Sequence, residues 1–378
     1  MKKIVFFILL FLCSIRAFSG ERECTTNCYQ GTALNSSGLY THFDKFPKYP
    51  ISHGVSAPFA GIINDWMIVA GGCNFPDVPA AKGGRKVYYS EIYAINMKEY
   101  SKCWKLLGRL PQNMAYGATV VIEDEIYFIG GENENGKLNS VYKVSLDCKT
   151  CKVDIETLPS IPECITNLSG TAIGNDIYIT GGITETDKNS MYRISTLLPG
   201  KWEKLASYPG NKRIQSILLS DGKNELYLIG GFELPSKKKN AVLSNDILCY
   251  NVESRSWDKF VELPLDDELE KRCMVGGSGV VHKNMLVLTG GVDYTIFSNA
   301  INGNVPEGYL EKPVGWYKFN SDVLLFDLKE KTWKVVKNVE GMAKAGGALL
   351  EYENVLYMIC GETKPGIRTD KIVTVPLF

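Results

Sequence analysis

A pair of adjacent glycines recurs along this chain, and each pair ends a short apolar run. The spacing is about fifty residues or somewhat more, a period typical of repeat folds in which each unit buries its apolar surface against its neighbours. Six similar units in 378 residues therefore predict one repeat domain rather than several unrelated ones. The pairs end at Gly72, Gly131, Gly182, Gly231 and Gly291, and the sixth run, residues 355–361, has Cys360 in place of the first glycine.

Each unit has the pattern of four strands. A strand rich in Gly, Ala or Ser precedes the apolar run, as in residues 115–121, and a loop and an alternating strand such as residues 246–252 follow the glycine pair. The fourth strand is often opened by tryptophan, at Trp104, Trp202, Trp257 and Trp333. Four strands at this period are typical of kelch repeats. We therefore predict an all-β fold, a six-bladed kelch-type β-propeller.

The sixth unit is incomplete. After Arg368 only one strand, residues 371–377, remains, so this unit lacks its outer strand. A candidate occurs at the other end of the chain, where the extended pattern of residues 39–46 precedes the first inner strand. Donating that strand to the C-terminal blade closes the ring and leaves no open sheet edge. We expect a single propeller domain over residues 39–378, closed by an N-terminal strand.

The first residues have the layout of a secretory signal. Lys2 and Lys3 precede an apolar run, residues 4–12, and small residues near Gly20 offer cleavage points. We expect a signal peptide over residues 1–20, a polar leader over 21–38, and export to the periplasm or beyond. Acidic and basic residues balance at 42 each, and no later segment is apolar for long enough to span a membrane. Nucleic-acid binding and a membrane span are therefore not expected.

Eleven cysteines are present, and one of them lies in the expected signal. The ten that remain permit disulfides in an exported protein. Two close pairs, Cys148 with Cys151 and Cys24 with Cys28, are candidates for local bridges, and a zinc site built from these four thiols is the alternative. Two others, Cys249 and Cys360, lie in apolar strand patterns and are expected to be small buried hydrophobic residues.

The loop after the sixth run departs from the repeat. Glu362 and Arg368 lie six residues apart on a turn stiffened by Pro365 and Gly366, where the other units continue from a glycine pair. Propeller ligands bind at the channel mouth, on the loops that follow the inner strands, so this acid and base are the first candidates for a site. Other residues just after the glycine pairs include Asn74 and Glu132.

The run Gly-Glu-Thr-Lys-Pro-Gly-Ile-Arg-Thr-Asp at residues 361–370 resembles the signature of the N-acetylneuraminate epimerases, or sialic acid mutarotases. Residues 70–76, Tyr116-Gly117 and residues 130–132 add to the resemblance, which covers nearly the whole chain from residue 39 onward. In that family the signature lies well inside the chain, whereas here it comes last. This order is similar to that of the subgroup called cyclically permuted mutarotases.

The resemblance implies a six-bladed kelch propeller that interconverts the anomers of N-acetylneuraminic acid or a related acidic sugar without cofactor or metal. It implies that Glu362 is the proton acceptor and that Arg368 holds the sugar carboxylate in a two-pronged pairing. Residues expected to bind or orient the sugar are Lys364, Asn74, Phe75, Tyr116 and Glu132.

Two other functions are compatible with a kelch propeller. A copper-radical oxidase needs histidine ligands, and only His42, His53 and His282 are present, scattered along the chain. A non-catalytic module that binds a protein or glycan is the more serious alternative. It predicts no pairing of Glu362 with Arg368, whereas an enzyme needs both at one channel mouth.

One loop is much longer than the rest. Residues 292–321 carry six aromatic side chains, and long aromatic loops in compact folds are usually functional. A disordered insertion is the alternative for this segment.

Overall fold

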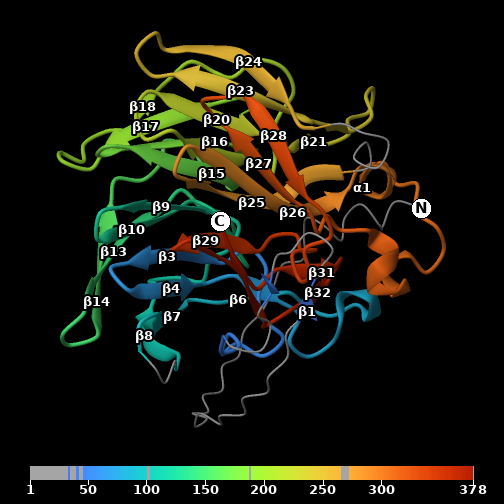
Figure 1. Cartoon of the computed structure of the whole chain (residues 1–378), viewed down its shortest axis with the longest axis horizontal. Coiled ribbons are helices and arrows are strands. Elements are labelled where there is room, and N and C mark those ends of the chain that lie inside the picture. The colour runs from blue at the N-terminus through green and yellow to red at the C-terminus, as the bar shows by residue number, and fades with distance from the viewer. Residues whose placement is uncertain are drawn as a thin grey trace.

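The computed structural model describes residues 33–34, 40–41, 46–99, 103–186, 189–264 and 272–377. In this part of the chain six antiparallel sheets of three or four strands are arranged as blades around a common axis (Figure 1). The inner strand of each blade neighbours the inner strands of the blades before and after it, and the last neighbours the first. The predicted six-bladed β-propeller is confirmed.

In each blade the strands follow one another from the channel to the rim. Blade 1 consists of β3 (Phe59–Ile63), β4 (Trp66–Ala70), β7 (Glu91–Asn96) and β8 (Lys105–Arg109); blade 2 of β9 (Ala118–Ile122), β10 (Glu125–Ile129), β13 (Val141–Asp147) and β14 (Lys152–Leu158); blade 3 of β15 (Thr166–Ile173), β16 (Asp176–Ile183), β17 (Met191–Ser195) and β18 (Glu203–Lys204). Blade 4 consists of β19 (Ile217–Ser220), β20 (Glu225–Ile229), β23 (Asp246–Asn251) and β24 (Ser256–Glu262); blade 5 of β25 (Arg272–His282), β26 (Met285–Asp293), β27 (Val323–Asp327) and β28 (Thr332–Val336); blade 6 of β29 (Ala348–Tyr352), β30 (Val355–Ile359) and β33 (Ile372–Pro376).

Short hairpins follow the second strand in four blades, all at the same end of the propeller. They are β5 (Cys73–Asn74) with β6 (Val87–Tyr88), β11 (Glu132–Asn133) with β12 (Gly136–Lys137), β21 (Phe232–Glu233) with β22 (Val242–Leu243), and β31 (Glu362–Lys364) with β32 (Ile367–Arg368). The helical elements are α1 (Tyr294–Ile301) and the 3-10 turns η2 (Ala80–Lys82), η4 (Tyr309–Glu311) and η5 (Val314–Tyr317). None of these helices is long and apolar enough to cross a membrane.

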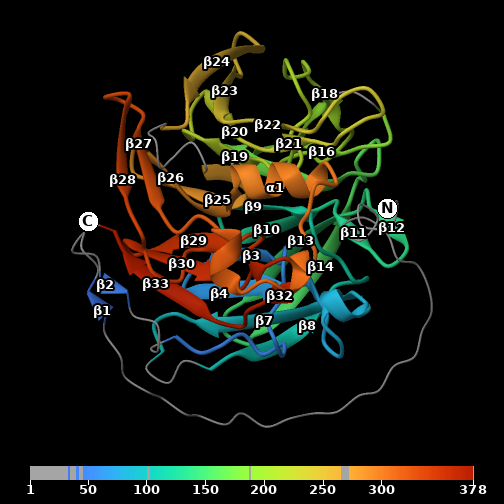
Figure 2. The same cartoon turned by 90° about the vertical axis from the view of Figure 1, so that its right-hand side faces the viewer.

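The N-terminal segment packs against blade 6, whose sheet has three paired strands among the described residues and does not include β2 (Tyr40–Thr41). The strand β2 pairs with β1 (Ala33–Leu34) and lies beside β33, where the predicted closing strand belongs (Figure 2). Backbone hydrogen bonds continue this junction, from Tyr49 N to the Asp370 carbonyl at 2.8 Å and from Gly361 N to the Val55 carbonyl at 2.9 Å. The expected signal and leader, residues 1–32, and most of residues 35–45 lie outside the described residues.

The glycine pairs lead from the second strand into the channel mouth. Gly71 and Gly72 have φ of +62° and +89°, a left-handed conformation that favours glycine. A Cβ added to Gly72 would lie 2.8 Å from the Val55 side chain, so the second position also lacks space. In blade 6 Cys360 adopts φ +54° at the first position, and Gly361 keeps the second. The turn therefore requires two successive left-handed residues, and the second of them is glycine in all six blades.

A closed ring of backbone hydrogen bonds joins all six blades at this mouth. One residue from each blade, just before the inner strand or near its start, has φ between +51° and +67°, and its N–H donates to the carbonyl of the corresponding residue in the preceding blade, at 2.6 to 3.2 Å. The six members of this mouth ring are Ala57, Tyr116, Asn167, Gln215, Gly276 and Gly346. The ring fixes the relative positions of the residues that line the mouth. Because its members share a backbone conformation and no side-chain type, the sequence pattern does not reveal it.

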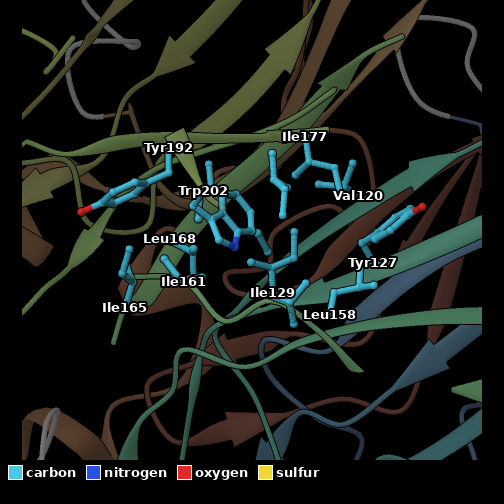
Figure 3. Packing of buried hydrophobic residues seen from close by; sticks show 14 of the residues in the cluster. Val120, Tyr127, Ile129, Leu158, Ile161, Ile165, Leu168, Ile177, Tyr192 and Trp202 are labelled. Atoms are coloured by element: carbon cyan, nitrogen blue, oxygen red, sulfur yellow. The ribbon is translucent and has the colours of Figure 1, made fainter. Parts of the chain in front are cut away.

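Apolar clusters fill the spaces between blades. Trp202 lies between blades 2 and 3, buried with Ile129 and Leu168, and its indole Nε1 donates to the Pro159 carbonyl at 2.9 Å (Figure 3). Tryptophan at this position, just before the outer strand, thus packs one blade against the next.

The cysteines follow the sequence predictions only in part. Cys249 and Cys360 are buried in apolar clusters, as predicted. The expected bridge between Cys148 and Cys151 is wrong, because both are free thiols. Cys148 is exposed with its Sγ near Asn64, whereas Cys151 packs against the core of blade 2, so the turn directs the two side chains to different surroundings. Cys24 and Cys28 lie outside the described residues.

Candidate functional site

Glu362 and Arg368 form an ion pair on the hairpin of blade 6. They are direct partners in the pairing of β31 with β32, so both side chains leave the same face of the hairpin. Arg368 Nη2 lies 2.7 Å from Glu362 Oε1. Only 3% of the Arg368 side chain is exposed, against 21% for Glu362, so the carboxylate is the more accessible partner. Gly366, with φ +80°, makes the tight turn that brings the pair together.

The Arg368 guanidinium is held in a buried position with unused donors. The Phe75 ring lies against its face, with 4.7 Å from Cζ to the ring centroid. Its Nε and Nη1 atoms are buried and have no hydrogen-bond partner among the described residues. Burial disfavours the charge, but the Glu362 carboxylate raises the pKa of Arg368 above its ordinary value. A buried charged donor without a partner is costly, so this arrangement favours a ligand that supplies acceptor oxygens.

Tyr116 lies between the ion pair and the next blade. It is a member of the mouth ring with φ +59°, and its hydroxyl accepts a weak hydrogen bond from Cys73 Sγ at 3.4 Å. Burial raises the pKa of this hydroxyl well above its usual value; Cys73 adds to the rise and Arg368 opposes it. The phenol therefore stays protonated at neutral pH and can donate a hydrogen bond to a ligand.

A second carboxylate, Glu132, occupies in blade 2 the position that Glu362 occupies in blade 6. Each is bridged to the residue before the mouth ring, Glu132 to Ala115 and Glu362 to Ala345. Glu132 accepts hydrogen bonds from the Tyr88 hydroxyl at 2.8 Å and from Thr166 Oγ1 at 3.0 Å.

The hydrogen bonds continue past Thr166 around the mouth. Thr166 Oγ1 accepts from Asn167 Nδ2 at 3.2 Å, and Asn167 Oδ1 accepts from Gln215 Nε2 at 3.0 Å. A polar chain therefore runs from blade 1 to blade 4 along one side of the mouth.

The other side of the mouth is apolar. The equivalent positions in blades 3, 4 and 5 are Ile183, Phe232 and Val292, and they belong to one cluster. Helix α1 lies against β22 and β26 over this cluster (Figure 2), with Phe297 edge-on to Phe232 at 5.2 Å between centroids. The mouth thus presents charged groups on one side and hydrocarbon on the other.

The long loop of residues 292–321 is ordered and bound to the site hairpin, so the alternative of a disordered insertion is wrong. Lys364 Nζ donates to the carbonyls of Leu310 at 3.2 Å and Lys312 at 2.8 Å. Tyr309 packs edge-on against Tyr317 at 5.5 Å. Burial, with smaller contributions from Tyr317 and Glu362, raises the pKa of Tyr309 to about 12.

The structure brings five of the predicted residues together: Glu362, Arg368, Phe75, Tyr116 and Glu132. The other two hold the surrounding loops. Lys364 anchors the long loop, and the Asn74 amide, 1% exposed, donates to the carbonyls of Ser52 and Gly54 and accepts from Tyr89. Direct contact of any of these side chains with a sugar stays a prediction.

Three site residues were not predicted as such: Lys86, Tyr88 and Tyr309. The first two lie in a Lys-Val-Tyr-Tyr run, and nothing local in this run shows that it reaches the mouth. Within the described residues no three His, Cys, Asp or Glu side chains are grouped to hold a metal ion.

Comparison with known proteins identifies the family. The family model of N-acetylneuraminate epimerase matches residues 39–153 and 158–377. This chain belongs to that family. Among similar proteins, the N-acetylneuraminate epimerase of Salmonella enteritidis PT4 (strain P125109) is 32% identical over 230 residues, 57% of each chain. That of Haemophilus influenzae (strain PittEE) is 28% identical over 234 residues, 58% of this chain and 59% of the relative.

The matched segment therefore spans little more than half the length of these curated relatives. A solved structure, "Structure of YjhT", superposes with a TM-score of 0.63 and covers 87% of this chain and 99% of its own. Its sequence is 16% identical, so this likeness concerns the fold alone.

Proposed function

We propose that this protein is an isomerase that interconverts the anomers of N-acetylneuraminic acid or a closely related acidic sugar. One observation carries the proposal: the Glu362–Arg368 ion pair at the channel mouth, in which two buried guanidinium nitrogens have no hydrogen-bond partner in the described part of the chain. Family membership and the names of the relatives agree with it. A binding module would not need the acid and the base on one hairpin face, so the pairing favours catalysis.

Anomer exchange begins at the hemiketal hydroxyl. Arg368 binds the sugar carboxylate through its unused donors, which places the neighbouring anomeric carbon next to the accessible oxygen of Glu362. Glu362 accepts the hydroxyl proton while the bond from the anomeric carbon to the ring oxygen breaks, and the ring oxygen takes up a proton from water, which is given back to water when the ring recloses. The products of this step are an open-chain ketone and an alcohol, so no electrons are transferred.

Reclosure is the reverse reaction on the other face of the carbonyl. After rotation about the bond to the carbonyl carbon, the alcohol oxygen attacks the opposite face, and Glu362 returns its proton to the new hemiketal oxygen. The Tyr116 hydroxyl, protonated because its pKa is raised, donates a hydrogen bond to the ring oxygen as that bond breaks. Because mutarotation also occurs in plain water, acid and base assistance of about a hundred to ten thousandfold suffices.

We further propose that the protein works outside the cytoplasm, on the strength of the signal pattern in residues 1–20. Comparing the N-terminus of the mature protein with that of the full chain by mass spectrometry tests this.

The function is tested by a one-dimensional NMR time course. A freshly dissolved single anomer of N-acetylneuraminic acid is followed with and without protein, beside neutral sugars as controls. The proposal expects faster equilibration for the acidic sugar alone. Equal rates with and without protein for every sugar would leave the non-catalytic binding module as the better interpretation.

A further inference from the structure

Lys86 lies in the channel mouth with an ammonium group that has no hydrogen-bond partner among the described residues. It precedes β6, and 23% of its side chain is exposed. Its Nζ lies 5.0 Å from the centroid of the Tyr116 ring and 5.6 Å from that of Tyr88. The nearest carboxylate oxygen, Glu132 Oε1, is 3.8 Å away, beyond hydrogen-bond reach.

Charge pairing with Glu132 does not explain where the Lys86 ammonium group lies. The Glu132 carboxylate already accepts from Tyr88 and Thr166 at ordinary distances, while Lys86 donates to neither oxygen. An ammonium group has three hydrogen-bond donors, and the contacts of Lys86 with the two rings and with Glu132 at 3.8 Å satisfy none of them. The gap between Lys86 and Glu132 therefore suits a ligand that offers two groups. One is an oxygen that accepts a hydrogen bond from the Lys86 ammonium, and the other is a hydroxyl that donates to the Glu132 carboxylate.

Tyr116 connects this place to the catalytic pair. Lys86 lies over its ring, whereas its hydroxyl contacts Cys73 Sγ, two residues before Phe75, whose ring covers Arg368. The catalytic pair and the Lys86–Glu132 gap are thus two parts of one continuous mouth, separated by one side chain. A ligand held by its carboxylate at Arg368 can extend past Tyr116 toward Lys86.

We propose that Lys86, with Glu132 and Tyr88, forms a second subsite that binds the oxygen-rich part of the sugar remote from its carboxylate. The inference rests on the proposed function and makes Lys86 a specificity-determining residue. Its partner is a neutral oxygen acceptor, either the carbonyl of an acylamino group or a hydroxyl of a polyol side chain. Glu132 accepts hydrogen bonds from adjacent hydroxyl or amide groups.

The test compares Lys86→Met and Lys86→Arg with the parent, using Lys82→Met as the matched control. Lys82 lies four residues upstream, exposed on η2. For the intact acidic sugar, Lys86→Met is expected to raise KM at least tenfold with kcat within about twofold, the size of one charge-assisted hydrogen bond. Lys86→Arg should recover part of the loss, and Lys82→Met should match the parent.

Two sugar analogues locate the contact. One carries a hydroxyl in place of the acylamino group, and the other lacks the terminal polyol carbons. The analogue without the contacted oxygen should bind the parent and Lys86→Met equally well. An unchanged KM for Lys86→Met on the intact sugar would overturn the subsite, as would the same loss on both analogues together with a lowered Tm.

Binding is measured separately by saturation-transfer NMR, so that the two proposals can fail independently. A parent protein that binds the intact sugar but does not accelerate exchange contradicts the proposed function, while weaker binding by Lys86→Met alone still supports the subsite. Equal binding by the parent, Lys86→Met and Lys82→Met contradicts the subsite whatever the exchange rates are.

Discussion

Replacing Glu362 with glutamine removes the proposed base and keeps its shape. General acid and base groups contribute about 10²- to 10⁴-fold, so the exchange rate should fall at least a hundredfold, about 2.7 kcal/mol in the barrier. The structure adds a cost in stability, because Arg368 is buried and Glu362 is its ion-pair partner. Removing one member of a buried pair typically costs about 3 to 5 kcal/mol.

Glutamine should avoid most of that cost. Its amide oxygen can still accept from Arg368 Nη2 across the 2.7 Å contact, and the Phe75 ring still covers the guanidinium. We expect Glu362→Gln to lose about 1 kcal/mol of stability, a few degrees in Tm at most for a domain of this size. Glu362→Ala, which leaves Arg368 without that acceptor, should lose several times more.

The assay is the NMR time course of anomer exchange, run for the parent and both variants at a temperature well below every Tm. Both variants should be equally slow, whereas only Glu362→Ala should melt markedly earlier. This contrast separates the catalytic role from the structural one. Parental exchange by Glu362→Gln would refute the assignment, and Glu132, the equivalent residue of blade 2, would become the next candidate base.

Three further outcomes are expected. Arg368→Lys keeps the charge but loses the planar fork, so it should cost about 1.5 to 3 kcal/mol of transition-state stabilisation for acidic sugars; equal kcat/KM would remove its role. Deleting residues 38–46 takes away the closing segment and Phe46, whose ring lies 5.4 Å from Tyr357, and should lower the free energy of unfolding by several kcal/mol; a Tm within a degree or two of the parent would contradict closure. Burial lowers the pKa of Lys344 to about 8 in the folded protein, below its unfolded value, so the unfolded chain binds the extra proton and stability rises as pH increases from about 8 to 10.5. In urea unfolding, the free energy of unfolding of the parent relative to that of Lys344→Met should rise by roughly 2 to 3 kcal/mol over that range. A pH-independent difference between the two proteins would contradict a buried lysine with a lowered pKa.

The fold and the pairing of Glu362 with Arg368 on one hairpin could be predicted from the sequence because both depend on local order. The glycine pairs mark where two successive residues must be left-handed, and the alternating runs between them define the strands of each blade. Glu362 and Arg368 are six residues apart on a hairpin, so their pairing is determined by the turn between them. Such a pairing forms wherever the hairpin itself forms, whatever the rest of the chain does.

Tertiary structure alone decided the rest of the site. The mouth ring joins residues from six blades through backbone atoms, which leave no side-chain pattern in the sequence. Lys86 lies 3.8 Å from Glu132 because neighbouring blades bring their loops to one rim, and Lys364, far along the chain, donates to carbonyls of the loop of residues 292–321. Closeness in sequence is not sufficient for contact, since Cys148 and Cys151 are both free thiols although only two residues separate them. Sequence determines what each blade is made of, whereas which side chains share the channel mouth depends on how the ring closes.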